Sequence, residues 1–282
     1  MKQIFIINAR GQKESFSAKK TFRSARRAGA SSELAQSITD TIKREVYPGI
    51  KTSVIFKRIK QLLQKKSPVT ALRFNIKEGM RKLGPTGFPF EKYIGEVLKS
   101  LGYKVSINQF LPGKCLNSYE VDFIAEKGNI VFVGECKYRN VFGERVHSSD
   151  ALENRARFFD IMAGSYFKSV RFQSREVRSM MVTNTKLTNR AQKYSLCSGT
   201  EILGWNYPIN KGLEYLIEKE KLYPITILPS LTSYLKDIFV AKKIMLVQDV
   251  LKQDLEFLAQ KLNVPSKNLS SLVREAEVLM KE

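Results

Sequence analysis

The sequence predicts an α/β protein in which a mixed sheet flanked by helices lies between a mostly helical N-terminal domain and a small all-helical C-terminal domain. Two runs rich in β-branched and aromatic residues, 121–125 and 130–138, are typical of strands in a sheet. Apolar residues at helical spacing precede and follow these runs. The length of 282 residues agrees with two or three domains.

Turn-forming residues suggest the domain boundaries. The stretch 83–89 contains two glycines and two prolines, and further prolines stand at Pro224 and Pro229. We therefore expect domains at residues 1–85, 86–222 and 223–282.

Positive charge is concentrated in the first of these domains. The chain has 48 Lys and Arg against 27 Asp and Glu, a formal net charge of +21. Residues 1–85 carry a net charge of +15, residues 86–222 of +5 and residues 223–282 of +1. Such a charge attracts polyanions, so nucleic acid is the expected partner.

Composition excludes several classes of protein. No apolar run approaches the ~20 residues that span a bilayer, and the apolar patch at the start is too short for a signal peptide. We therefore expect a cytoplasmic protein without membrane association. The three cysteines form no CxxC pair and His147 is the only histidine, which argues against disulfide frameworks, zinc sites and histidine-based catalysis.

The N-terminal domain is expected to begin with a strand at 3–8 and a turn at Arg10-Gly11. Helices follow at about 18–29, 33–46, 51–65 and 68–82. The third of these alternates apolar and basic positions, so its lysines form either an ordinary solvated face or a phosphate-binding surface.

A pair of carboxylates is the most specific feature of the middle domain. If Gly128-Asn129 form a two-residue hairpin loop, Asp122 and Glu135 are directly opposed on neighbouring strands. Lys137 shares their face because strand side chains alternate. Opposed like charges destabilise a hairpin, and a cation such as Mg²⁺ between them removes that cost. The alternative is an ordinary exposed polar face.

The helix before these strands adds a third acid. Apolar side chains at Phe90, Ile94, Val97, Leu98 and Leu101 form its buried stripe. Glu91 lies at the edge of that stripe and can reach the sheet, whereas Glu96 lies on the opposite face. A helix N-terminal acid favoured by the macrodipole is the other interpretation of Glu91.

The middle domain resembles the PD-(D/E)xK restriction-endonuclease-like superfamily, most closely its Mrr-type branch, over residues 88–208. The matching motifs are Phe90-Glu91-Lys92-Tyr93, Glu120-Val121-Asp122 and Gly134-Glu135-Cys136-Lys137-Tyr138. The resemblance implies a mixed sheet in α-β-β-β-α-β order and Mg²⁺-dependent DNA cleavage, with Mn²⁺ as a substitute. It implies that Asp122, Glu135 and the carbonyl of Cys136 bind the metal, that Lys137 orients the attacking water or stabilises the transition state, and that Glu91 assists.

Residues 3–85 resemble the ATP-cone, a regulatory module that binds ATP or dATP. The resemblance rests on Gly11, on Glu14-Ser15-Phe16-Ser17 and on Lys20 at the start of a helix. The Lys-Arg pair usual in that family is replaced by Asn8-Ala9. Arg10, Lys13 and Lys20 are therefore the candidate contacts for nucleotide phosphates.

The remaining assignments concern the C-terminal domain and single residues. Residues 223–282 resemble helical-hairpin DNA-binding domains, although a packing role agrees equally with their low charge. Arg139, Arg155 and Arg157 are candidate DNA contacts, with solvated arginines as the alternative. His147 is expected at the surface and Trp205 in the core, and Ser266 is expected to cap the last helix.

Together these features predict a metal-dependent deoxyribonuclease of restriction type (type II or IV) acting on double-stranded DNA. Cutting of both strands makes a homodimer or higher homo-oligomer reasonable. One alternative is a nucleotide-responsive DNA-binding regulator with an inactive nuclease fold. The other is a nuclease that repairs DNA or resolves junctions.

Overall fold

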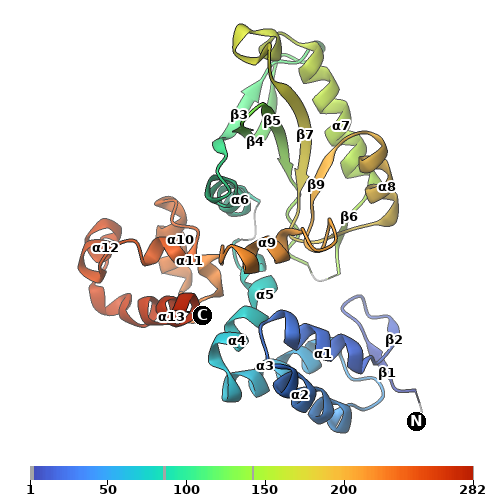
Figure 1. Cartoon of the computed structure of the whole chain (residues 1–282), viewed down its shortest axis with the longest axis vertical. Coiled ribbons are helices and arrows are strands. Elements are labelled where there is room, and N and C mark those ends of the chain that lie inside the picture. Colours follow the sequence, from blue (N-terminus) through green and yellow to red (C-terminus); the bar gives the residue numbers. More distant parts are fainter. Residues whose placement is uncertain (1–2, 85–86, 142, 282) are drawn as a thin grey trace.

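The computed structural model describes residues 3–84, 87–141 and 143–281. Within this part of the chain it contains 13 α-helices and a five-stranded mixed sheet, and two further sheets have two strands each. Figure 1 shows three groups of elements: the large sheet with its helices at the top, the N-terminal helices below, and the C-terminal helices to one side. The mixed α/β prediction is confirmed at this level.

The N-terminal group closely follows the predicted order. Its elements are β1 (Phe5–Ile7), β2 (Lys13–Ser15), α1 (Ala18–Arg27), α2 (Ser32–Glu45), α3 (Thr52–Lys66), α4 (Pro68–Phe74) and α5 (Ile76–Arg81). Ser17, Ser31 and Ser67 cap α1, α2 and α4 because each side-chain oxygen accepts a hydrogen bond from a backbone N–H. The single helix expected at 68–82 is divided at Asn75, which leaves helical geometry.

The large sheet has the strand order β3-β4-β5-β7-β9. Its strands are β3 (Lys104–Leu111), β4 (Tyr119–Lys127), β5 (Ile130–Cys136), β7 (Glu176–Val182) and β9 (Glu201–Leu203). The first three pair antiparallel, and β5, β7 and β9 pair parallel. Helix α6 (Phe88–Ser100) lies on one face and α7 (Ser148–Ala163) on the other (Figure 1).

The β4–β5 hairpin has the register predicted from its loop. Lys127 pairs with Ile130 across Gly128-Asn129, and the ladder continues to Phe123 opposite Gly134. Gly128 has φ +55°, a value that favours glycine. The next position of this register places Asp122 opposite Glu135.

Gly134 makes room for the ring of Phe123. A Cβ at position 134 would lie 2.0 Å from that ring, so no larger residue fits without displacement. Phe123 thereby packs with Phe90 and Tyr93 of α6 in the main hydrophobic core. Because side chains alternate along a strand, Glu135 points to the other face, toward α7.

The second half of the chain adds short elements and the C-terminal helices. These are β6 (Arg145–Val146), β8 (Lys186–Leu187), α8 (Asn189–Cys197), α9 (Leu213–Lys219), α10 (Ser233–Ala241), α11 (Val247–Val250), α12 (Leu255–Leu262) and α13 (Ser270–Lys281). Trp205 is buried, as predicted. The capping prediction for Ser266 is wrong, because that residue opens a 3₁₀ turn and α13 begins only at Ser270.

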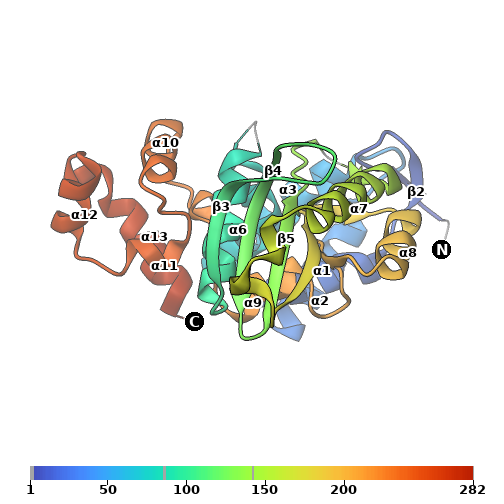
Figure 2. The ribbon, with the colours of Figure 1, turned by 90° about the horizontal axis from the view of Figure 1, so that it is seen from above.

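The C-terminal helices share a core with the elements around them. Met80 of α5, Phe90 of α6 and Phe239 of α10 belong to one hydrophobic cluster. Thr226 donates a hydrogen bond to the Gly79 carbonyl over 2.6 Å. Figure 2, seen from above, shows these helices projecting from the side of the sheet. The predicted boundary between residues 85 and 86 lies outside the described residues, and the three-domain division stays a prediction.

None of the described helices is both long enough and apolar enough to cross a lipid bilayer.

Candidate active site

A cavity of about 590 Å³ opens where β4 and β5 meet α7. Strand β4 contributes Asp122, strand β5 Glu135 and helix α7 Arg157. The other lining residues are Ser118, Tyr119, Glu120, Glu153 and Ala156. The two carboxylates singled out in the sequence therefore face one cavity.

Asp122 is held by the neighbouring strand. Its Oδ2 accepts a hydrogen bond of 2.6 Å from the backbone N–H of Cys136. Burial first, and the negative charge of Glu135 second, raise the pKa of Asp122 to about 7. A carboxyl group with such a pKa carries its negative charge only at an energetic cost, which a bound cation would reduce.

Glu135 is buried and joins two cations from different elements. Its Oε1 lies 2.8 Å from Nζ of Lys137, and its Oε2 lies 2.6 Å from Nη1 of Arg157. The Lys137 backbone is fixed as well: its N–H donates to the Val182 carbonyl, and its carbonyl accepts from the Thr183 hydroxyl. The predicted sharing of a face by Glu135 and Lys137 is therefore seen.

Glu91, in the first turn of α6, belongs electrostatically to the same site. Burial raises the pKa of its carboxyl group, and the charges of Glu120 and Glu135 raise it further. Asp122 in turn responds to the charge of Glu91. Three acids thus influence one another here, as the position of Glu91 at the edge of the helix stripe predicts.

Arg157, which the sequence offers only as a candidate DNA contact, lies in the site and binds one of its acids. Its guanidinium forms ion pairs with Glu135 and with Glu153, one turn earlier on α7. The i, i+4 spacing of Glu153 and Arg157 was a visible signal for the second pair. The pairing with Glu135 depends on how α7 lies against the sheet, which sequence spacing does not give.

Asn108 is a second residue that sequence reasoning missed. It lies between Ile107 and Gln109, which pair with Phe123 and Val121, so it is opposite Asp122. Its φ of +52° is unusual for a non-glycine residue inside a strand. Such a conformation stores strain of order 1–3 kcal/mol and recurs at functional sites.

The other two candidate arginines are engaged within the protein. Arg139 forms an ion pair of 3.0 Å with Asp150, and its backbone exchanges hydrogen bonds with the side chain of Asn184. Arg155 lies over the ring of Phe159 at 4.1 Å. His147 is exposed, as predicted, and caps α7.

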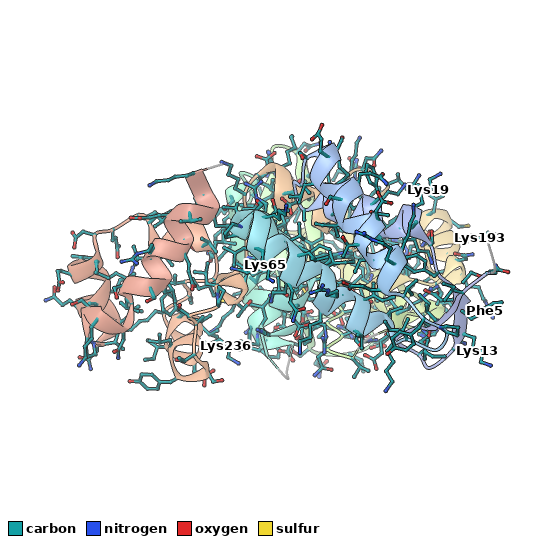
Figure 3. The ribbon with its side chains drawn as sticks, turned by 90° about the horizontal axis from the view of Figure 1, so that it is seen from below. Phe5, Lys13, Lys19, Lys65, Lys193 and Lys236 are labelled. Carbon is teal, nitrogen blue, oxygen red and sulfur yellow. The ribbon has the colours of Figure 1, made fainter. Side chains whose placement is uncertain are left out.

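The candidate nucleotide contacts lie in the turn between β1 and β2, on β2 and in the first turn of α1. Arg10 donates to the Gly143 carbonyl, and the Lys20 ammonium lies 3.8 Å from the Glu14 carboxylate. Lys13 is exposed on β2. Figure 3 looks onto the N-terminal helices and shows Lys13, Lys19 and Lys65 spread over that side of the molecule. Arg10 and Lys20 thus have partners within the protein, and nucleotide binding by Arg10, Lys13 and Lys20 stays a prediction.

The donor set fits a hard cation better than zinc. Among the described residues, no group of three or more His, Cys, Asp and Glu side chains is arranged to hold a metal ion. Mg²⁺, however, is commonly bound by one or two carboxylates, with water and substrate phosphate completing its shell. Asp122 and Glu135 provide that pair. The third expected ligand is the carbonyl of Cys136, and the backbone N–H of the same residue donates to Asp122.

Comparison with known proteins gives relatives without an assigned activity. Residues 223–280 match the family model described as AF1548-like, C-terminal. An uncharacterized protein from Archaeoglobus fulgidus is 28% identical over 186 residues, which make up 65% of this chain and 98% of that protein. A crystal structure described as a protein of unknown function, AF1548, has a TM-score of 0.58 and 26% identity, and the match covers 70% of this chain and 100% of that one. The mixed α/β architecture is therefore shared with a solved structure.

Proposed function

We infer that the chain is a Mg²⁺-dependent DNA endonuclease with a restriction-endonuclease-like core. The observation that carries this proposal is that Asp122 and Glu135 line one cavity, with Lys137 in an ion pair with Glu135. Glu91 lies close enough for its charge to raise the pKa of Asp122. Apart from the two-residue strand β6, which pairs with β8 outside the large sheet, and two 3₁₀ turns, the element order α6-β3-β4-β5-α7-β7 agrees with the α-β-β-β-α-β order of that superfamily.

Each residue has a chemical task in this proposal. Asp122 and Glu135 would hold the cation, which supplies charge stabilisation and lowers the pKa of a bound water. Lys137, fixed through its backbone, would hold the attacking water or the phosphate oxygen by its ammonium group. Arg157 would keep Glu135 in place and offer its positive charge to the scissile phosphate.

The net charge of +21 supports a polyanionic substrate. Phosphodiester hydrolysis needs a negatively charged polymer to approach a site that itself contains several acids. The positive charge concentrated before residue 86 would supply that attraction. Restriction, repair and junction resolution share this chemistry.

A plasmid assay tests the proposal. The full chain is incubated with supercoiled DNA in Mg²⁺ or Mn²⁺, beside the variants Asp122→Asn and Lys137→Gln. Asp237→Asn is the matched control, because it removes an exposed carboxylate on α10. We expect nicking or linearisation by the wild type and the control only. Equal cleavage by all four proteins would place the chemistry elsewhere, and DNA binding without cleavage in either metal would favour the regulatory alternative.

A further inference from the structure

A second cavity lies between the N-terminal hairpin and the sheet-bearing part of the chain. Its volume is about 270 Å³. The turn between β1 and β2 lines one side with Asn8, Ala9, Arg10 and Gln12, and α5 contributes Lys77. The other side consists of Gly143, Glu144 and Arg145 with Thr185 and Lys186. The cavity is separate from the site of Asp122 and Glu135.

Four cations surround this cavity: Arg10 from the β1–β2 turn, Lys77 from α5, Arg145 from β6 and Lys186 from β8. In the part of the chain that the structure describes, none of the four forms an ion pair. Glu144 is the single acid among the lining residues. The cavity is therefore strongly positive.

Two of these cations are forced together by strand pairing. Arg145 on β6 and Lys186 on β8 are direct partners in a two-stranded parallel sheet. Neighbouring strands lie about 4.8 Å apart. Like charges directly opposite each other are destabilising. Neutral residues would fit equally well at these exposed positions. An anion that binds both side chains would explain why two cations stand opposite each other there.

Lys77, like Arg145 and Lys186, lies where its positive charge is unfavourable. Burial lowers the pKa of its ammonium group, and the charge of Lys186 lowers it further, while Glu214 offsets part of the effect. The ammonium also lies 5.9 Å from the ring centre of Trp205. A negatively charged ligand beside Lys77 and Lys186 would relieve this unfavourable placement.

Hydrogen bonds hold the loop at residues 143–145 against the β1–β2 turn. Arg10 donates from Nε and Nη2 to the Gly143 carbonyl, over 2.9 Å and 2.6 Å. A Cβ on Gly143 would lie 2.9 Å from Cγ of Arg10, and the φ of Gly143 is +83°. Thr185 fixes the next residue by donating to the Glu144 carbonyl. The turn and the loop are thus held in place around the four cations.

We propose that this cavity binds a phosphate group. Guanidinium and ammonium groups converging from several elements match the oxygens of a phosphate. Two sources share that chemistry: a free polyphosphate, such as that of a nucleotide, and a backbone phosphate of nucleic acid. The site stands independently of the nuclease proposal, because none of its residues touches the catalytic cavity.

The test compares the full chain with the double variant Arg145→Gln/Lys186→Gln. Both positions are exposed, so the variant should fold, and thermal unfolding without phosphate checks this. The matched control is Lys261→Gln/Lys267→Gln, which removes two exposed charges from the C-terminal segment. Trp205, the only tryptophan, reports on ligands beside Lys77 through its fluorescence.

Three titrations without divalent metal follow each protein: sodium tripolyphosphate, ATP and a short DNA duplex. We expect the pocket variant to bind at least one of them about tenfold more weakly than the control, the loss expected for one charge-assisted hydrogen bond. Weakening with tripolyphosphate or ATP identifies a free phosphate, and weakening with DNA alone identifies a backbone phosphate. Equal affinities of pocket variant and control for all three ligands would overturn the proposal. A second variant, Lys77→Gln, should repeat the weakening.

Discussion

The carboxylate of Glu135 on β5 lies 2.6 Å from the guanidinium of Arg157 on α7, so that a single ion pair ties the sheet to the helix that covers it. Lys137 binds the other oxygen of the same carboxylate. Both oxygens of Glu135 thus have a cationic partner, which is how a buried acid avoids the cost of an isolated charge.

Removing the Arg157 charge should lower stability. In Arg157→Met the Glu135 carboxylate keeps only Lys137, and we expect the free energy of unfolding to fall by about 1.5–3 kcal/mol, the range for a hydrogen bond to a charged group. Denaturant unfolding in the presence of a chelator measures this loss.

Arg178→Met is the matched control for this substitution. Arg178 also joins two acids, Glu176 and Glu201, but at a more exposed place on the sheet. Exposed pairs contribute about 0–1 kcal/mol. An equal loss of unfolding free energy in both variants would show that the pair of Arg157 with Glu135 stabilises the fold no more than an exposed pair does.

The Phe123–Gly134 contact predicts a second stability effect. Gly134→Ala forces the ring of Phe123 away, because the new Cβ would lie 2.0 Å from it. We expect a loss of about 1–3 kcal/mol, as for other overpacked cores. The measurement is again denaturant unfolding.

A double-mutant cycle identifies the cause of that loss. Phe123→Leu leaves more room over position 134, so Gly134→Ala should cost less in its presence. A coupling free energy of about 1 kcal/mol between the two positions is expected for residues in contact. Simple additivity would mean that backbone effects, and not the ring, determine the cost.

Glu218 predicts a pH-dependent stability. Burial raises the pKa of this carboxyl group from 4.5 to about 7, although it accepts a hydrogen bond from Tyr223. Its pKa in the folded state lies above that in the unfolded state. The unfolded chain therefore releases the proton first as the pH rises from about 4.5 to 7, and folding loses stability over this range.

Glu218→Gln removes this dependence, because the neutral amide can still accept from Tyr223. At pH 8 we expect the variant to be more stable than the wild type by about 3 kcal/mol, and the difference should shrink toward pH 5. Melting curves at several pH values measure it. Glu277→Gln, at an exposed position of α13, should show no such trend. A constant offset between Glu218→Gln and wild type at every pH would contradict the assignment.

Much of the candidate site could be predicted because it depends on local rules. The Gly128-Asn129 loop sets the register of its hairpin, and that register brings Asp122 beside Glu135. Alternation along β5 places Lys137 on the face of Glu135. The position of Glu91 follows from the periodicity of its helix.

The features that escaped prediction depend on tertiary structure. The ion pair of Arg157 with Glu135 requires a particular placement of α7 over the sheet. The left-handed backbone of Asn108 is not signalled by a strand-like sequence. Likewise, the division of the 68–82 helix at Asn75 accompanies packing of α5 into the core that the C-terminal helices share.

The central claim is that Asp122 and Glu135 bind a divalent cation, and direct titration tests it most simply because it requires no particular DNA sequence. Mn²⁺ is titrated into the wild type, Asp122→Asn and the control Asp237→Asn, with bound ion measured by electron paramagnetic resonance. We expect one site in the wild type and the control that is lost in Asp122→Asn. Mn²⁺ binding that is equal in all three proteins, or absent from the wild type, would contradict the claim.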